Sequence, residues 1–171
     1  NLRDLAYSYI EKYNPSKQQI KTYLLKKYLK KFQGSKTRKE VTGIIDNIVS
    51  NLEKSHLLND GLYSDSRARR LFRRGYSLNK IAHSLKSKGI EQRNIVSSLE
   101  KIKNEKSDPD FGSAMKICKK RRIGPMRPES NRELFYKKDM GVLARAGFDY
   151  DLSKRVLNLE QEEFQKLIKI I

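Results

Sequence analysis

At 171 residues the chain can form one large domain or several small ones, and with 37% hydrophobic residues its core has to be shared between neighbouring elements. Its 38 Lys and Arg against 20 Asp and Glu give a net charge of +18, which indicates a polyanionic or acidic partner and favours nucleic acid, or a protein assembly built on it. No apolar run approaches the roughly 18 residues of a membrane-spanning helix, and the first residues lack the apolar core of a signal peptide, so we expect a cytoplasmic protein without a membrane partner.

Metal, cofactor and catalytic motifs are missing from the sequence. The lone cysteine, Cys118, cannot form an internal disulfide, and the two histidines, His56 and His83, are far apart with no cysteine pair, which fits no zinc site. There is also no glycine-rich phosphate loop, no Cys/His pair and no serine elbow. We therefore expect no metal, no cofactor and no enzymatic activity, with Cys118 in the core.

The chain repeats itself at intervals that predict its organisation. The segment IVSNLEK at 48–54 returns as IVSSLEK at 95–101, 47 residues later. Two further echoes pair Ser16, Ile20 and Leu24 with Ser77, Ile81 and Leu85, and Leu85, Gly89 and Ile90 with Leu143, Gly147 and Phe148. Repetition in register predicts three units, 1–57, 58–107 and 108–171. The unequal spacings place extra loop residues around Gly34-Ser35, before Thr37, and at 123–130.

Each unit is expected to contain three helices, which are clearest in the middle one. Asp60 is a candidate N-cap for the first helix and Ser77 for the second, while Gly89 fits the left-handed position that ends the second helix, as Gly147 does in the third unit. Residues expected on apolar faces are Ser64, Ala68, Leu71, Phe72 and Gly75, then Ile81 and Leu85, then Ile95, Val96 and Leu99, with Ile48, Val49 and Leu52 as the counterparts of the last three.

No stretch of useful length alternates with period two, so the predicted fold class is all-α. We expect a tandem array of three three-helix repeats, in which the first repeat has a long connection between its second and third helices. Because such units bury their apolar faces partly on one another, the array should form an elongated, curved crescent, with its handedness left open. An extended surface of this kind suits a partner that is itself long.

The basic excess extends along the chain, at +7, +7 and +4 for the three units. Two stretches are the densest. On a helical wheel, "RARRLFRRG" places five arginines opposite its apolar arc, in one solvent-facing sector: Arg67, Arg69, Arg70, Arg73 and Arg74. The stretch "KICKKRRIG", in the equivalent helix of the third unit, adds Lys116, Lys119, Lys120, Arg121 and Arg122. Charge runs are usually solvated helix faces, but the near absence of acidic residues after Asp65 favours a binding face. Tyr63 lies on the same sector and could stack on a base, or pack under arginine stems.

Several of these residues carry a resemblance to a known family. Those matching the central signature of the RecX regulatory proteins are Leu58-Asn59-Asp60, Tyr63, Gly75, Ile81, Leu85 and Lys88-Gly89-Ile90. Leu143 and Gly147-Phe148 resemble the closing motif of that family, and Ser16, Ile20 and Leu24 resemble its opening motif. The chain departs from the pattern at Tyr76-Ser77-Leu78, where a glycine followed by a glycine-proline pair is usual, and at Leu71, where arginine is common.

The resemblance implies a modulator of the RecA recombinase that acts in recombination and DNA repair. Such a protein binds the RecA filament on single-stranded DNA and restrains ATP hydrolysis, strand exchange and filament extension, with no chemistry of its own. The expected partners are the RecA filament and single-stranded DNA, with double-stranded DNA also open, and we expect a monomer. The alternative is a free-standing DNA-binding module of helix-turn-helix-like repeats. Against this alternative, no helix presents an evident set of base-reading side chains on one face.

Overall fold

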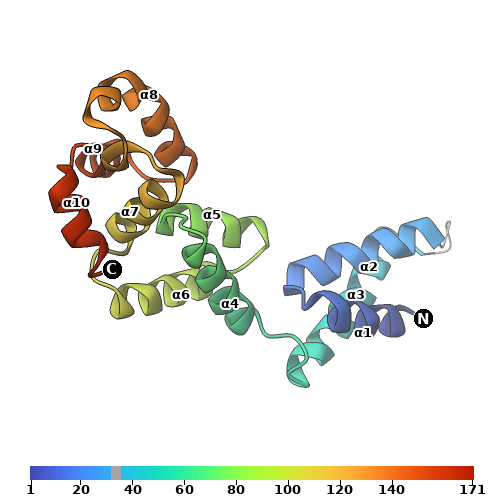
Figure 1. Cartoon of the computed structure of the whole chain (residues 1–171). Helices are drawn as coiled ribbons and strands as arrows, with labels where there is room; N and C mark the ends of the chain where they lie inside the picture. Colours follow the sequence, from blue (N-terminus) through green and yellow to red (C-terminus); the bar gives the residue numbers. More distant parts are fainter. Residues whose placement is uncertain (32–35) are drawn as a thin grey trace. The chain divides into compact units, whose positions relative to one another are not determined.

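A computed structural model of the chain describes residues 1–31 and 36–171, and all regular structure in these ranges is helical (Figure 1). The all-α prediction is therefore confirmed. The elements are α1 (Leu2–Tyr13), α2 (Lys17–Lys31), α3 (Arg38–Lys54), α4 (Asp60–Arg73), α5 (Leu78–Ser87), α6 (Gln92–Glu105), α7 (Pro109–Arg121), the 3-10 turn η1 (Gly124–Met126), α8 (Glu129–Arg145), α9 (Tyr150–Leu157) and α10 (Gln161–Ile168).

The chain divides into two compact units. The first contains residues 1–66 and 85–96, and the second contains 67–84 and 97–171, so that α4, α5 and α6 each contribute to both. The predicted repeat limits, 57/58 and 107/108, fall in the connections between α3 and α4 and between α6 and α7. Whether these two positions are also the limits of repeats stays a prediction. Each unit has a buried core of its own.

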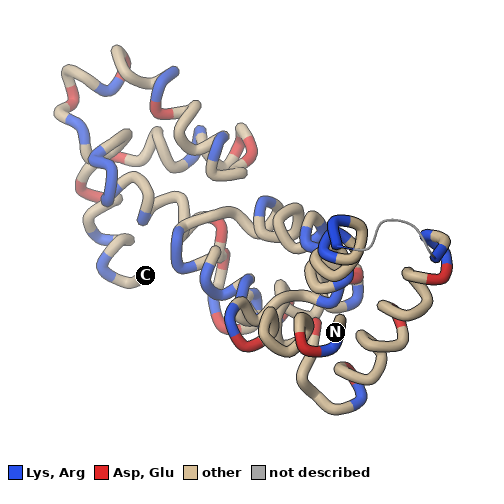
Figure 2. The backbone as a smooth tube through the Cα atoms, turned by 90° about the vertical axis from the view of Figure 1, so that its right-hand side faces the viewer, with Lys and Arg blue, Asp and Glu red and all other residues tan. Residues whose placement is uncertain are grey.

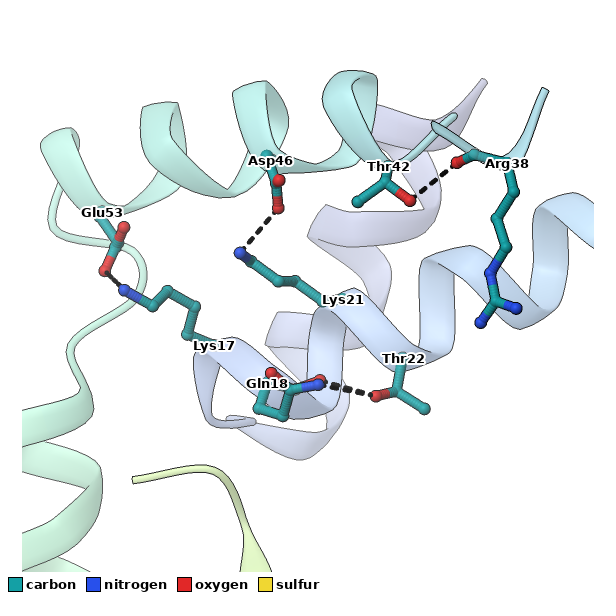
Figure 3. Close-up of polar contacts among 8 residues, drawn as sticks. All are labelled: Lys17, Gln18, Lys21, Thr22, Arg38, Thr42, Asp46 and Glu53. Atoms are coloured by element: carbon teal, nitrogen blue, oxygen red, sulfur yellow. Dashed lines mark hydrogen bonds and ion pairs between the residues drawn. The ribbon is translucent and has the colours of Figure 1, made fainter. Parts of the chain in front are cut away.

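In the first unit, α1, α2 and α3 enclose a core made from one face of each helix. Its buried members are Ala6, Ile20, Leu24, Val41, Ile45, Ile48, Val49, Leu52 and Leu58. On the outside, two ion pairs join α2 to α3: Lys17 Nζ lies 2.9 Å from Glu53 Oε1, and Lys21 Nζ lies 2.7 Å from Asp46 Oδ1 (Figure 3). Positive charge in this part of α2 is therefore balanced within the bundle.

The long connection expected between the second and third helices of the first repeat stays a prediction, although the length of α2 accounts for some of the extra residues. The helix α2 has 15 residues whereas its counterpart α5 has 10, so part of the extra length is helical. The helix α3 begins soon afterwards, where Thr37 forms a capping box with Glu40. The predicted loop residues Gly34-Ser35 lie outside the described residues.

The core of the second unit is built by α7, α8, α9 and α10. Its buried members are Ala114, Met115, Cys118, Ile123, Leu143, Ala146, Phe148, Val156, Leu157 and Phe164. The burial expected for Cys118 is confirmed, and it raises the pKa of the thiol to about 12. In this C-terminal stretch the three-helix prediction is wrong, because four α-helices and η1 follow residue 108. The additional helix, α10, is held by Phe164, whose ring is fully buried.

The apolar faces predicted for the middle helices are largely buried. Ala68, Ile81 and Leu85 are inaccessible to solvent, and Ile95 is 2% exposed. Val96 is an exception, since 48% of it is exposed whereas its counterpart Val49 is buried. The sequence echo at 48–54 and 95–101 therefore does not give identical environments. The segment repeats, but the surroundings of its second residue do not.

The two predicted helix stops are confirmed, with φ of 74° at Gly89 and 94° at Gly147. Both stops use the same hydrogen bonds. Ile90 N donates to Leu85 O at 3.2 Å, and Phe148 N donates to Leu143 O at 3.1 Å. In each case the donor is the residue directly after the left-handed glycine, which is the hydrogen bond typical of a Schellman C-terminus. This bond brings the apolar side chain of that residue, Ile90 or Phe148, back over the end of the helix.

The start of α2 is capped by two residues from different parts of the first unit. Ser16 Oγ accepts from Gln19 N at 3.2 Å, and Asp60 Oδ1 accepts from Lys17 N at 2.9 Å. The prediction that Asp60 caps its own helix is therefore wrong. Asn59 takes that role, because its Oδ1 accepts from Leu62 N at 3.1 Å.

The start of α5, in the second unit, has the same arrangement. Ser77 Oγ accepts from Lys80 N at 3.0 Å, as predicted for this cap, and Asp110 Oδ1 accepts from Leu78 N at 2.9 Å. Each of these carboxylates comes from the start of a helix that lies later in the chain, α4 for Asp60 and α7 for Asp110. The serine and aspartate that cap α2 therefore recur at α5 as a repeated tertiary contact.

The cap at Asp110 yields a testable expectation. Burial raises the pKa of this carboxyl above its ordinary value, so its ionised form is less stable in the folded chain than in the unfolded one. Stability from this group is therefore greatest below its unfolded pKa and falls as pH rises through the folded value. Asp110→Asn keeps an oxygen acceptor for Leu78 N without the charge, and we expect it to unfold at pH 7 at the same urea concentration as wild type or a higher one.

The control for this experiment is Asp110→Ala, which leaves Leu78 N without its acceptor. It should lose about 1–3 kcal/mol, the usual cost of an unpaired buried donor. Urea unfolding at pH 7 and pH 4, followed by circular dichroism, measures both variants. If Asp110→Asn is as unstable as Asp110→Ala at pH 7, the negative charge rather than the acceptor stabilises the start of α5.

Candidate functional site

Two of the five arginines predicted to share one solvent-facing sector are engaged by neighbouring helices of the chain. Arg67 is half-buried, and its Nε and Nη2 donate to Ser84 Oγ on α5 at 3.3 and 3.2 Å. Arg69 forms a bidentate ion pair with Glu105 on α6: its Nη1 donates to Oε2 at 3.0 Å and its Nη2 donates to Oε1 at 2.7 Å. The wheel was misleading because it omits the helices that pack against α4. Arg67 thus links α4 to α5, and Arg69 links α4 to α6. Their role in partner binding stays a prediction.

The other members of this stretch are more accessible. Arg70, Arg73 and Arg74 are exposed at the end of α4, and Tyr63 is half-buried in its first turn. Lys and Arg are frequent on the helices of both units, as Figure 2 shows along the backbone. Partner binding by Tyr63, Arg70, Arg73 and Arg74 stays a prediction.

The second predicted cluster lies at the end of α7. Lys116, Lys119, Lys120, Arg121 and Arg122 are all exposed. Arg122 ends the helix in a left-handed conformation with φ of 55°, and its N–H donates to Cys118 O. Positive side chains in a last helical turn are favourable by themselves, because they offset the negative end of the helix dipole.

A groove in the second unit brings parts of the two clusters together. It has a volume of about 440 Å³ and is called the basic groove below. Its lining residues are Arg74, Tyr76, Lys80, Ile117, Lys120, Arg121, Val142, Arg145 and Ala146. They come from the connection between α4 and α5, from α5, from α7 and from the end of α8. Five of them are Lys or Arg, and no carboxylate is among them.

Three polar members of the groove were missed in the sequence: Tyr76, Lys80 and Arg145. Lys80 Nζ lies 4.5 Å from the centroid of the Tyr76 ring and donates a hydrogen bond to Arg145 O. The guanidinium of Arg74 lies 5.6 Å from the same ring centroid. Tyr76 thus holds two cations near its ring by cation–π contacts. The available signal was Tyr76 itself, an aromatic residue directly after Gly75 where the family pattern has glycine.

Apolar side chains also line the groove: Ile117, Val142 and Ala146. Gly75 has φ of 92°, and a Cβ atom there would lie 3.0 Å from Ile117 Cγ1, so a side chain at this position would push against Ile117. A groove lined by both cations and aliphatic carbon is suited to an anion that also carries apolar groups.

Metal clusters and membrane-spanning helices would each indicate a different kind of site. No group of three or more His, Cys, Asp or Glu is placed to hold a metal ion within residues 1–31 and 36–171. In the same ranges, no helix is both long and apolar enough to cross a membrane.

Comparison with known proteins gives three relatives. The chain is 31% identical over 160 residues to the regulatory protein RecX of Myxococcus xanthus, an alignment covering 92% of this chain and 84% of that protein. It is 33% identical over 123 residues to the regulatory protein RecX of Clostridioides difficile, covering 67% of this chain and 52% of that protein. For the Agrobacterium fabrum regulatory protein RecX the identity is 25% over 111 residues, and the shares are 65% and 57%. No family model and no solved structure matches the chain.

Proposed function

The chain belongs to the RecX family of regulatory proteins, and we propose that it regulates the RecA recombinase by binding RecA filaments on single-stranded DNA. Bound there, it restrains ATP hydrolysis, strand exchange and filament extension, and it catalyses no reaction itself. The observation that carries this proposal is the similarity to a regulatory protein RecX along 92% of the chain. The basic groove supports it, because a filament on DNA offers phosphates and acidic protein surface to a chain with a net charge of +18.

The free-standing DNA-binding module is the second candidate, and the basic groove is the observation in its favour. Five cations around one groove could bind DNA without RecA. The two candidates differ in what they do to RecA at saturating DNA. A regulator of the filament changes RecA turnover directly, whereas a DNA-binding module only competes for the strand. Location in the cytoplasm and a monomeric state are further predictions for this chain.

RecA ATP hydrolysis separates the two candidates. With single-stranded DNA in excess over RecA, we expect the chain to lower the steady-state rate at concentrations far below those needed to cover the DNA. Without RecA it should release no phosphate. An unchanged RecA rate at saturating chain, inhibition that disappears when DNA is added in excess, or ATP turnover by the chain alone would contradict the proposal.

A further inference from the structure

We propose that the basic groove binds the phosphodiester backbone of a single nucleic-acid strand. This deepens the proposed function by naming what one surface of the chain contacts, and it rests on that function only for identifying the strand as DNA. The groove combines residues from α5, α7, the end of α8 and the connection between α4 and α5 in the second unit. Three of its polar members, Tyr76, Lys80 and Arg145, belong to neither basic cluster of the sequence.

Positive charge in the basic groove exceeds what the protein itself offsets. The ends of α4, α7 and α8 meet the groove, and each helix C-terminus carries the equivalent of about −0.5 charge. Together they offset about 1.5 of the five positive charges, so an excess of about 3.5 stays in the groove. By contrast, the charge of Arg69, which does not line the groove, is neutralised by Glu105. An excess of this size in one groove, with no acidic residue lining it, favours an anion from outside the chain.

The basic groove has the size of a small-molecule site. Its volume of about 440 Å³ is within the range of roughly 300–1,000 Å³ for sites that hold small molecules. One or two nucleotide units of a strand have this size. An interface between two folded proteins is instead a broad surface of about 800 Å² on each partner. The dimensions therefore favour a narrow polymer over a folded protein surface.

The basic groove is lined by charged and apolar side chains together. A nucleic-acid strand alternates phosphates with sugars and bases, so its anionic and apolar groups contact the protein together. Arg121 and Lys120 can reach phosphate oxygens from α7, while Ile117 and Val142 offer aliphatic surface for a sugar or base edge. Lys80 uses one of its three donors on Arg145 O and has others available for the strand.

Tyr76 acts as a positioning residue within this groove. Its ring lies 4.5 Å from Lys80 Nζ and 5.6 Å from Arg74 Cζ, so it keeps two long side chains near the groove before the strand arrives. Such pre-organisation reduces the entropy lost on binding. Phenylalanine would keep the ring face, whereas leucine would fill similar space without it.

Binding of a fluorescent oligo(dT) strand to the full chain, without RecA, tests the assignment. Anisotropy measured over a range of salt concentrations gives both the affinity and the salt slope. For Lys120→Gln with Arg121→Gln we expect weaker binding and a slope smaller by about 1.4, at about 0.7 for each lost phosphate contact. The matched control is Lys154→Gln with Lys169→Gln, which removes the same charge from exposed positions outside the groove. Its slope should stay near that of wild type.

Equal slopes for the groove variant and its control would overturn the proposal. Poly-glutamate provides a second test, because it presents carboxylates in place of phosphates. If it displaces the strand from wild type as well as unlabelled oligo(dT) does at equal charge, the groove recognises acidic protein instead. Since RecA is absent, failure here leaves RecA inhibition by wild type to be judged separately.

The positioning role of Tyr76 is tested in the same assay. Tyr76→Leu should weaken strand binding by about two- to five-fold, the effect of an exposed cation–π contact, and flatten the salt slope. Tyr76→Phe should bind as wild type does. Melting temperatures show whether each variant is folded. Wild-type affinity and slope in folded Tyr76→Leu, or a loss in Tyr76→Phe equal to that in Tyr76→Leu, would rule out this role.

Discussion

Gly147→Ala is expected to destabilise the protein by about 2–6 kcal/mol, although it adds only one methyl group. Two costs combine. The backbone there has φ of 94°, a strained conformation for any residue with a side chain, at about 1–3 kcal/mol. In addition, the new Cβ would lie 2.3 Å from Ser77 Oγ and 2.6 Å from Lys80 Cβ, and such overpacking costs another 1–3 kcal/mol or so.

The same change at Gly89 should have a similar effect, because a Cβ there would lie 2.3 Å from Gln18 Cβ at φ of 74°. Gly43 provides the matched control. It lies within α3 and is exposed, and an added Cβ atom would have no neighbour within 4 Å, so Gly43→Ala should stabilise the chain by about 0.5–1 kcal/mol. Thermal unfolding of the three variants measures these shifts. Unchanged melting of both Gly89→Ala and Gly147→Ala would refute the repeated helix stop as a structural element.

Arg127→Met should cost about 3–5 kcal/mol, because it leaves a buried carboxylate without its cation. Asp139 is 1% exposed, and its two oxygens accept from Arg127 at 2.7 and 2.8 Å. Its other hydrogen bond comes from Gly124 N at 2.9 Å. The Arg127 guanidinium also lies 4.3 Å from the centroid of the Phe135 ring, so methionine can fill its space but cannot replace its charge.

The Arg69–Glu105 pair is a control that distinguishes the cost of an unpaired buried charge from the cost of losing any arginine. Arg69 forms a bidentate pair with Glu105 as Arg127 does with Asp139, but both side chains of the Arg69–Glu105 pair are about half exposed. Arg69→Met should therefore cost no more than about 1 kcal/mol. Urea unfolding compares them, and Arg127→Met with Asp139→Asn should recover part of the loss, since asparagine can still accept from Gly124 N. If Arg127→Met and Arg69→Met lower the free energy of unfolding equally, burial of the Asp139 carboxylate does not account for the cost.

Local patterns in the sequence were enough to predict much of the fold. The apolar faces around Ala68 and Ile81, the serine cap at Ser77 and the glycine stops depend on neighbours within a few residues, so periodicity and caps reveal them. Contacts between residues far apart in the sequence cannot be predicted from such local patterns. Asn59 and Asp60 are both good N-caps, and the start of α2, 43 residues earlier, decides which of them caps α4. The fourth helix of the C-terminal stretch was missed for lack of a counterpart in the middle repeat.

The candidate site was only partly visible in the sequence for the same reason. Clusters of arginine and lysine are evident from composition, but which of them are neutralised is not. Glu105 lies 36 residues beyond Arg69, and no local rule joins them. Conversely, Arg74 and Lys120 belong to separate clusters and line one groove only because the end of α4 and α7 meet in the second unit. Sequence reasoning identified the charge, and folding determined where it is available.

Action of this chain on the RecA filament is tested most directly by comparing two affinities. The same labelled single strand, bare in one sample and covered by RecA with a non-hydrolysable ATP analogue in the other, is titrated with the chain at one salt concentration. Co-sedimentation of the filament and anisotropy of the bare strand give the two dissociation constants. We predict that the filament is bound much more tightly than the strand alone. Equal affinities, or tighter binding of the bare strand, would contradict regulation through the filament and leave a DNA-binding module.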